Sequence, residues 1–390
     1  MNESPAEMLR RRWLAAAVVV CGVLSNLASS VEELGGDAPE QGADTVAQVV
    51  QVPLTPEVVV PMLLMGTYAP YETAGYAVTS LNTTTGAFRD LAEKTCAGGV
   101  AYAQNKKTGL ALFACQTGAT YSLNSGTLEL RLVVKIPTGA IYLPTLACTD
   151  DGTCFIGRGN YSRPGQPSTA ALVVLSGNGS VLETMALPDR GENRVPLKMR
   201  VIRNDSGKEK LVVVTQGYSH DDIGVHTLDV ETRKWQSLCS IKAEQVSVGI
   251  GKDVVLTLRR GLSADEPDAL VVDASTCAIK GSPRIPIDEM GIPIARFAVQ
   301  TDEAIYLGGG SERTQDVGPF GVWKFDATTY QNTGHLQTPD YVFAGTYAKS
   351  TGKLWVATRG SLIFEIDTNT MTKVREFSKP LFGGDMFYVE

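Results

Sequence analysis

Four residues that lie close together in the chain are the first candidates for acid–base or metal chemistry: His220, Asp221, Asp222 and His226. A protein metal site needs three or four converging ligands, commonly histidine and carboxylate side chains. His220 falls in an expected loop and His226 in the expected strand after it, a spacing that allows convergence without requiring it. A polar loop is the favoured interpretation, so we predict no metal ion and no cofactor. His220 and Asp222 remain ligand-binding candidates.

Three arginines form a second set, because each ends a strand-like apolar run and is followed by glycine: Arg158, Arg260 and Arg359. If these runs are equivalent strands, the three guanidinium groups lie at equivalent heights on one face. Converging guanidinium groups favour carboxylate or phosphate ligands, which they bind through paired hydrogen bonds. The favoured interpretation is nevertheless that they are solvated loop charges paired with acidic neighbours such as Asp265, Glu266 or Asp268.

The common catalytic motifs are missing from the sequence. It contains no Gly-x-Ser-x-Gly nucleophile elbow and no Cys-x-x-Cys pair. The glycine run 308–310 ends an expected strand with no helix after it, so it does not resemble a phosphate-binding loop. We therefore assign no catalytic residue and favour a role other than catalysis.

The elements that must position these residues follow from a repeated unit. An apolar run ends in Asp, Asn or Ser and leads into a turn, at seven positions: Asn82, Asn124, Ser176, Asp229, Asp273, Asp326 and Asp367. Successive positions are 42, 52, 53, 44, 53 and 41 residues apart, which suits the four short strands of a propeller blade. An Asp or Asn that closes a strand accepts hydrogen bonds from backbone amides two residues later. We interpret these residues as turn formers, not as catalytic groups.

A second strand signal precedes every unit, in segments rich in β-branched and aromatic residues that begin near Met62, Gly109, Thr153, Lys210, Asp253, Ala304 and Lys353. The first copy has no clear inner strand before it, and the β-rich end Asp385–Glu390 could supply one. We predict an all-β fold over residues 58–390. It is a seven-bladed β-propeller of four-stranded blades, whose ring is closed by the C-terminal strand in blade one.

Two segments resemble a known group of propellers. Residues 65–88 (MGTYAPYETAGYAVTSLNTTTGAF) are similar to its opening blade, and residues 353–370 (KLWVATRGSLIFEIDTNT) to its later blades. The group is that of the YVTN-type and lactonase-like seven-bladed propellers, which includes the quinoprotein dehydrogenase-like proteins. Membership among the lactonases would imply hydrolysis of a sugar lactone by polar residues at the mouth of the central channel.

The N-terminus resembles an export signal. Arg10–Arg12 precede an apolar run, Trp13–Leu24, and the small residues 28–30 suit cleavage, so we predict a signal peptide over residues 1–30. The run is too short to span a hydrocarbon core of about 30 Å as a helix. Alternatives are an uncleaved anchor through residues 13–28 or a bacterial twin-arginine signal that leads to the periplasm. Residues 31–57 read as a disordered acidic leader.

Cysteine usage agrees with export, because six cysteines remain after the signal and an even number in an exported chain suggests disulfides. Cys148 and Cys154 flank a turn, as do Cys96 and Cys115, which leaves Cys239 with Cys277. In the region after the predicted signal peptide, glycosylation sequons start at Asn82, Asn160, Asn178 and Asn204.

The net charge of −7 argues against a nucleic-acid partner, which would need concentrated Lys and Arg. In a propeller, the B–C and D–A loops share the face on which ligands usually bind, and several B–C loops here are long. We predict a secreted or surface-exposed module that binds a protein or a glycan through this face. The alternative is a lactonase-like hydrolase, and a structural component of a surface coat is a third hypothesis.

Overall fold

The structure is a computed structural model. It describes residues 48–49, 59–68, 76–91, 100–136, 144–159, 170–188, 194–204, 206–217, 222–258, 267–286, 293–311, 320–379 and 385–390. The contacts between residues divide the chain into two units, Met1–Val46 and Ala47–Glu390. All described residues belong to the second unit. These residues form strands and turns, with no helix among them.

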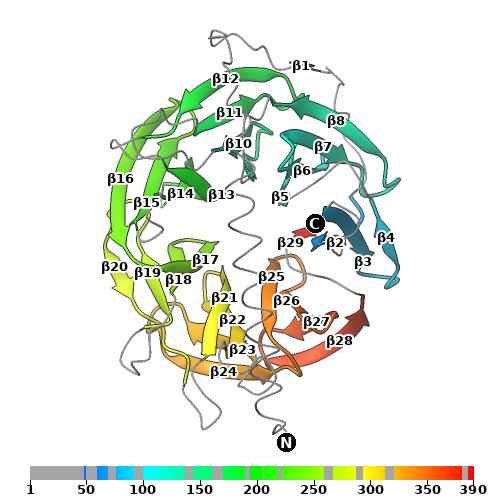
Figure 1. Ribbon diagram of the computed structural model, residues 1–390, viewed down its shortest axis with the longest axis vertical. Coiled ribbons are helices and arrows are strands. Elements are labelled where there is room, and N and C mark those ends of the chain that lie inside the picture. The colour runs from blue at the N-terminus through cyan, green and yellow to red at the C-terminus, as the bar shows by residue number, and fades with distance from the viewer. Residues whose placement is uncertain are drawn as a thin grey trace, which may run out of the picture. The chain divides into compact units, whose positions relative to one another are not determined.

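Seven antiparallel sheets form the blades of a ring, and we number them I to VII (Figure 1). From the innermost strand A to the outermost strand D, blade I consists of β29 (Met386–Val389), β2 (Met62–Tyr68), β3 (Tyr76–Asn82) and β4 (Phe88–Asp90). Blade II consists of β5 (Val100–Gln104), β6 (Ala111–Cys115), β7 (Ala119–Leu123) and β8 (Leu130–Lys135). Blade III consists of β9 (Thr145–Cys148), β10 (Cys154–Arg158), β11 (Ala171–Leu175) and β12 (Val181–Ala186).

The remaining four blades continue the same order. Blade IV consists of β13 (Val195–Arg203), β14 (Glu209–Gln216), β15 (Asp222–Asp229) and β16 (Lys234–Lys242). Blade V consists of β17 (Gln245–Ile250), β18 (Val254–Leu258), β19 (Ala269–Val272) and β20 (Ile279–Gly281). Blade VI consists of β21 (Pro293–Gln300), β22 (Ala304–Ser311), β23 (Gly321–Asp326) and β24 (Asn332–Gln337), and blade VII of β25 (Val342–Ala348), β26 (Lys353–Thr358), β27 (Leu362–Asp367) and β28 (Thr372–Ser378).

The A strands contact one another in cyclic order, from β29 through β5, β9, β13, β17, β21 and β25 back to β29. Seven apolar cores lie between neighbouring blades, so the packing also closes on itself. The core between blades VII and I, for example, joins Trp355 to Leu63 and Met65, all nearly inaccessible to solvent. Both sides of the middle strands are therefore covered, which is why β6 and β11 read as continuous apolar runs.

The closing strand is confirmed. β29 pairs with β2 over four residues, from Met62 opposite Val389 to Met65 opposite Met386. Ring closure in this way covers the edge of β2, so blade I has four strands like the other blades. The predicted seven-bladed propeller with a C-terminal closure is the observed fold.

The seven repeated units are the turns between strands C and D. In blade I, the Asn82 Oδ1 atom accepts hydrogen bonds from the amides of Thr84 and Thr85, both at 2.9 Å. In blade VI, Asp326 accepts the amides of Thr328 and Thr329 in the same manner. The C–D turns and the A–B turns lie at one edge of the blades, which we call the turn face. The B–C and D–A connections lie at the other edge, which we call the loop face.

One strand lies outside the four-stranded pattern. β1 (Gln48–Val49) pairs with the outer edge of β8, with Gln48 opposite Lys135 and Val49 opposite Val134. These two residues belong to the segment 31–57 that was expected to be a disordered leader. The outer strand of a blade leaves backbone groups unpaired, and an extended segment can satisfy them by strand addition.

Candidate ligand-binding site on the loop face

Two of the three candidate arginines lie at the loop face in the same register. Arg158 is the last residue of β10, and Arg359 follows directly after β26. Each arginine directly follows the residue of strand B that pairs with the first residue of strand A. These pairs are Gly157 opposite Thr145 and Thr358 opposite Val342. Arg260 lies outside the described residues. The repeat therefore carries two guanidinium groups to equivalent positions on blades III and VII.

The surroundings of these two arginines differ. Arg158 is half-buried, and its Nε atom is buried without a hydrogen bond to the described part of the chain. Arg359 is exposed, and its backbone amide donates to the Tyr341 carbonyl at 2.8 Å. Two blades separate III from VII on the shorter way round the ring. The two side chains are therefore not neighbours along the ring.

Asp222 is buried and already bound by other side chains. Its carboxylate accepts hydrogen bonds from the Arg194 guanidinium and from the Ser240 hydroxyl, and both charged side chains are almost fully buried. Arg194 directly precedes β13, and Asp222 is the first residue of β15. The pair thus fixes the D–A and B–C connections of blade IV where they enter the sheet, which is a structural role for this candidate.

His226 lies inside blade IV, four residues after Asp222 on the same side of β15. Its Nε2 atom is 3.0 Å from the Thr215 hydroxyl, and its ring meets the edge of the Trp235 ring. A Cβ atom on Gly224 would lie 2.4 Å from the His226 Nε2 atom, so glycine makes room for the imidazole. His220 lies outside the described residues, within which no group of three His, Cys, Asp or Glu side chains is arranged to hold a metal.

A charged contact across the ring was missed from the sequence. The Lys198 ammonium pairs with the carboxylate of Asp385, which directly precedes β29. Lys198 lies on β13, and in the cyclic order β5 and β9 separate β13 from β29. The ion pair therefore joins opposite sides of the ring axis. The sequence shows only that Lys198 and Arg200, two residues apart on β13, share one side of that strand.

Arg200 lies two residues after Lys198, on the same side of β13. It donates one hydrogen bond, from Nη1 to the Ile250 carbonyl at 2.7 Å. The Arg200 side chain is exposed to solvent, but the protein around it partly desolvates the guanidinium and lowers its pKa, while the charges of Glu390 and Asp302 oppose that shift. Burial raises the pKa of Tyr102 well above its ordinary value, and the charge of Asp385 adds to the shift. The innermost part of the ring thus carries charged groups of both signs, Lys198 and Arg200 on β13 and Asp385 beside β29.

Glu390 fastens the end of the closing strand to both neighbouring blades. Gln104 of blade II donates to the Glu390 carbonyl at 2.6 Å and accepts the Glu390 amide at 3.2 Å. On the other side, the Ser350 amide of blade VII donates to the Glu390 carboxylate at 2.6 Å. Tyr347 lies nearby, and its pKa is raised by burial and then by the charges of Glu303, Glu390 and Asp302.

Two disulfides join described residues: the one predicted from the hairpin, Cys148–Cys154, and one between Cys239 and Cys277, the pair that the sequence left over without a signal of its own. Cys148 and Cys154 are direct partners in the β9–β10 hairpin. Cys239 on β16 is bonded to Cys277 in the C–D turn of blade V, so this bond ties two neighbouring blades together. Cys115 is also disulfide-bonded, and its predicted partner Cys96 lies outside the described residues. These bonds indicate an oxidising compartment.

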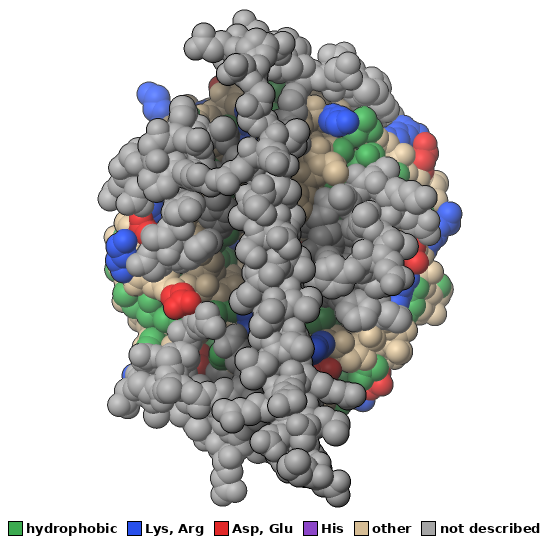
Figure 2. All heavy atoms as spheres, in the orientation of Figure 1, with side chains coloured by type: hydrophobic (Ala, Val, Ile, Leu, Met, Phe, Trp, Pro, Cys, Tyr) green, Lys and Arg blue, Asp and Glu red, His purple; other side chains and the backbone are tan. Residues whose placement is uncertain are grey.

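On the surface that Figure 2 shows, Lys and Arg side chains are interspersed with Asp and Glu around the rim, and neither sign forms a continuous patch among the coloured atoms. Within the described ranges, no helix has the length and apolar character needed to cross a membrane.

Comparison with known proteins gives a likeness of fold at low sequence identity. No family model matches the chain, and no curated protein matches it. Among solved structures, the dihydro-heme d1 dehydrogenase NirN is similar at 14% identity with a TM-score of 0.55, over 89% of this chain and 72% of NirN. The likeness is one of propeller architecture.

Two further structures extend this comparison. A Bacteroides uniformis protein with a proposed 6-phosphogluconolactonase assignment is similar at 15% identity with a TM-score of 0.54, over 84% of this chain and 99% of the other. Saccharomyces cerevisiae Sqt1 is similar at 10% identity with a TM-score of 0.56, over 86% and 88%. The resemblance to lactonase-like propellers therefore holds for the fold. At such identities it carries no activity over to this chain.

Proposed function

We propose that this protein is an exported propeller that binds a protein or glycan partner through its loop face. The observation that carries the proposal is an asymmetry in the length of the connections. The A–B and C–D connections are at most six residues long, as in 105–110, whereas the β10–β11 connection covers residues 159–170 and the β18–β19 connection residues 259–268. Long connections on one edge of a rigid scaffold commonly carry binding.

The export part of the proposal is supported by the disulfides and by the signal-like N-terminus. Disulfides persist in secreted proteins and are rare where thiols are kept reduced. The basic residues before an apolar run of signal length point the same way.

The hydrolase alternative receives less support from the described side chains. A general base must reach its proton and must be free to accept it. Asp222 is held by Arg194 and Ser240, and His226 is enclosed within blade IV beside Thr215. Among the candidates that the structure describes, the two arginines at the loop face are better suited to binding an anionic group than to moving a proton.

The test uses the full chain produced in a secretory host. The secreted protein is applied to an array of immobilised glycans and to intact cells with and without protease treatment. We expect binding to one of these surfaces, weakened at least several-fold by Arg158→Ala or Arg359→Ala. Arg89→Ala is the matched control, because Arg89 is exposed on the outer strand β4. Equal losses in all three variants would count against the loop face, and turnover of a sugar lactone that Arg158→Ala abolishes would favour the hydrolase.

A further inference from the structure

Of the four glycosylation sequons that follow the predicted signal peptide, three lie on the turn face. Asn82 is in the C–D turn of blade I, Asn178 is in the C–D turn of blade III, and Asn204 is in the A–B turn of blade IV. The fourth, Asn160, follows the loop-face end of β10 and lies outside the described residues. The described sequons therefore gather at one edge of the ring.

These three asparagines share one local geometry. In each, the Oδ1 atom accepts a hydrogen bond from the backbone amide two residues later, which belongs to the Ser or Thr of the sequon. The distances are 2.9 Å for Thr84 on Asn82, 3.2 Å for Ser180 on Asn178 and 3.1 Å for Ser206 on Asn204. The carboxamide oxygen of each asparagine is therefore hydrogen-bonded within the turn.

The carboxamide nitrogen of each of these asparagines makes no such hydrogen bond within the described part of the chain. Asn178 and Asn204 are exposed and Asn82 is half-exposed, and none of their Nδ2 atoms donates a hydrogen bond within the described part of the chain. Asn105, which is no sequon, shows the contrast. It is buried, and its Nδ2 atom donates to the Gly152 carbonyl at 3.2 Å. The sequon asparagines thus present to solvent the one atom that N-glycosylation modifies.

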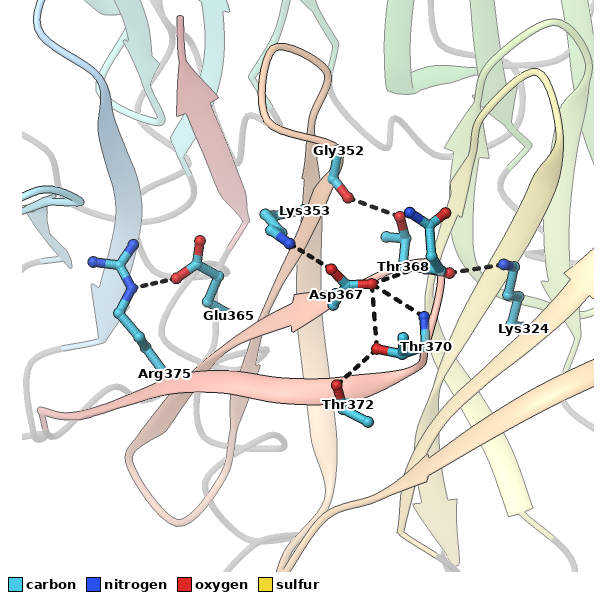
Figure 3. A network of polar contacts seen from close by, with 10 residues as sticks. Lys324, Gly352, Lys353, Glu365, Asp367, Thr368, Thr370, Thr372 and Arg375 are labelled. Atoms are coloured by element: carbon cyan, nitrogen blue, oxygen red, sulfur yellow. Dashed lines mark hydrogen bonds and ion pairs between the residues drawn. The ribbon is translucent and has the colours of Figure 1, made fainter.

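The equivalent turns show that the fold needs only the oxygen. Figure 3 shows Asp367 in blade VII, whose carboxylate accepts the amides of Asn369 and Thr370 at 2.9 and 3.0 Å. Asp326 and Asp229 form the same kind of turn. An aspartate can therefore replace the sequon asparagine without loss of the turn, which makes Asn→Asp a matched substitution.

We propose that the turn face is the glycan-bearing face of this propeller, modified at Asn82, Asn178 and Asn204, and that the glycans leave the loop face open to its partner. The donor would be a lipid-linked glycosyl diphosphate of the secretory pathway. The Asn Nδ2 atom forms a bond to the sugar C1 atom and loses one proton. The C1–O bond breaks, and the diphosphate departs with its electron pair. This proposal rests on the export part of the proposed function.

The test is glycopeptide mass spectrometry of the full chain, secreted from a eukaryotic host. We expect a glycan at each of the three asparagines. Asn82→Asp and Asn204→Asp should each remove one glycan and leave the melting temperature of the enzymatically deglycosylated protein unchanged, and Thr84→Val should also remove the glycan at Asn82. A secreted chain with any of the three asparagines unmodified would overturn the proposal.

A gain-of-site variant tests the geometry independently. Asn124 forms the same turn in blade II, where its Oδ1 atom accepts the Gly126 amide at 2.8 Å, but Gly126 takes the place of the Ser or Thr that a sequon needs. Gly126 is not among the residues of positive φ, so Gly126→Ser is compatible with the backbone. We expect this variant to gain one glycan at Asn124, and no gain would contradict the role given to the turn.

Failure of export is a separate outcome. If the chain stays inside the cell with its own N-terminus, the export part of the proposed function is wrong. Replacement of residues 1–30 by an established secretory signal then delivers the rest of the chain to the glycosylation machinery, and the presence or absence of the three glycans still decides the inference.

Discussion

Lys198 and Asp385 form an ion pair across the ring axis, between the A strand of blade IV and the residue that leads into the closing strand β29. The two residues are 187 positions apart in the chain. The closing strand is therefore held in its own blade by pairing with β2 and from the far side of the ring by a charge. We therefore expect that loss of this ion pair makes local opening of β29 easier but lowers the stability of the whole propeller only slightly.

Asp385→Asn tests this coupling. Both side chains are about 40% exposed, and ion pairs at such exposure contribute only about 0–1 kcal/mol. We expect a small change in melting temperature but hydrogen exchange of the β29 amides that is up to several-fold faster, with the difference reduced at high salt. Glu129→Gln is the control, because it breaks a similarly exposed pair with Arg131 on β8. If hydrogen exchange of β29 became equally faster in both variants, the ion pair with Lys198 would not be what holds β29 in place.

The closing strand should also depend on its apolar residues. Met386 is 5% exposed and packs in the core between blades VII and I. Met386→Ala should lower the free energy of unfolding by about 2–5 kcal/mol, because it removes buried methylenes and leaves a cavity. Val374→Ala on β28, where the side chain is 48% exposed, should change it by less than about 0.5 kcal/mol. Chemical denaturation of the two variants measures the difference, and similar values would mean that β29 adds little to the ring.

The fold was predictable because its signals are local. An Asp or Asn that closes strand C binds amides only two or three residues away, so Asn82 and Asp326 mark their turns within a short stretch of sequence. The spacing of the seven units then set the number of blades, and the strand without a partner in blade I identified the closing strand.

The site was less predictable because its contacts are long-range. Asp222 read as part of a polar loop, but Arg194, 28 residues earlier, buries and neutralises it. His226 read as part of a polar His/Asp cluster that could converge on a ligand, but β15 is covered on both sides, so the ring packs against Trp235. No local pattern reports which charge lies across a ring, and the Lys198–Asp385 pair therefore could not be derived from spacing.

The buried pair in blade IV gives a prediction about Asp222. Asp222→Ala should lower the free energy of unfolding by about 3–5 kcal/mol, because removal of one partner leaves the Arg194 charge buried without its carboxylate. A binding role alone would predict an unchanged stability and a weaker interaction with the partner. Urea unfolding followed by tryptophan fluorescence distinguishes the two, and a fully stable Asp222→Ala variant would restore Asp222 as a ligand-binding candidate.

The two disulfides should differ in their contributions. Cys239 and Cys277 close a chain segment of 38 residues, and Cys148 and Cys154 one of 6. In the loop-entropy model these lengths correspond to about 4 and about 2 kcal/mol of stabilisation, respectively. The double variant Cys239→Ala/Cys277→Ala should therefore lose more stability than Cys148→Ala/Cys154→Ala in denaturant titrations under non-reducing conditions. The reverse order would show that the contact between blades IV and V does not depend on the covalent link.

The turn aspartates should make the propeller sensitive to acid. The Thr329 and Thr328 amides lower the pKa of Asp326, and the Thr232 amide and hydroxyl lower that of Asp229. A carboxyl whose folded pKa lies below its unfolded value of about 3.9 stabilises the fold above that pH, and this contribution is lost as the pH falls through the folded pKa. Asp326→Asn keeps the oxygen acceptor, as Asn82 does in blade I, but cannot be protonated in this range. We therefore expect the melting temperature to fall less in the variant than in the wild type when the pH is lowered from 7 to 3. Parallel losses in the two proteins would show that the ionised turn does not contribute to acid unfolding.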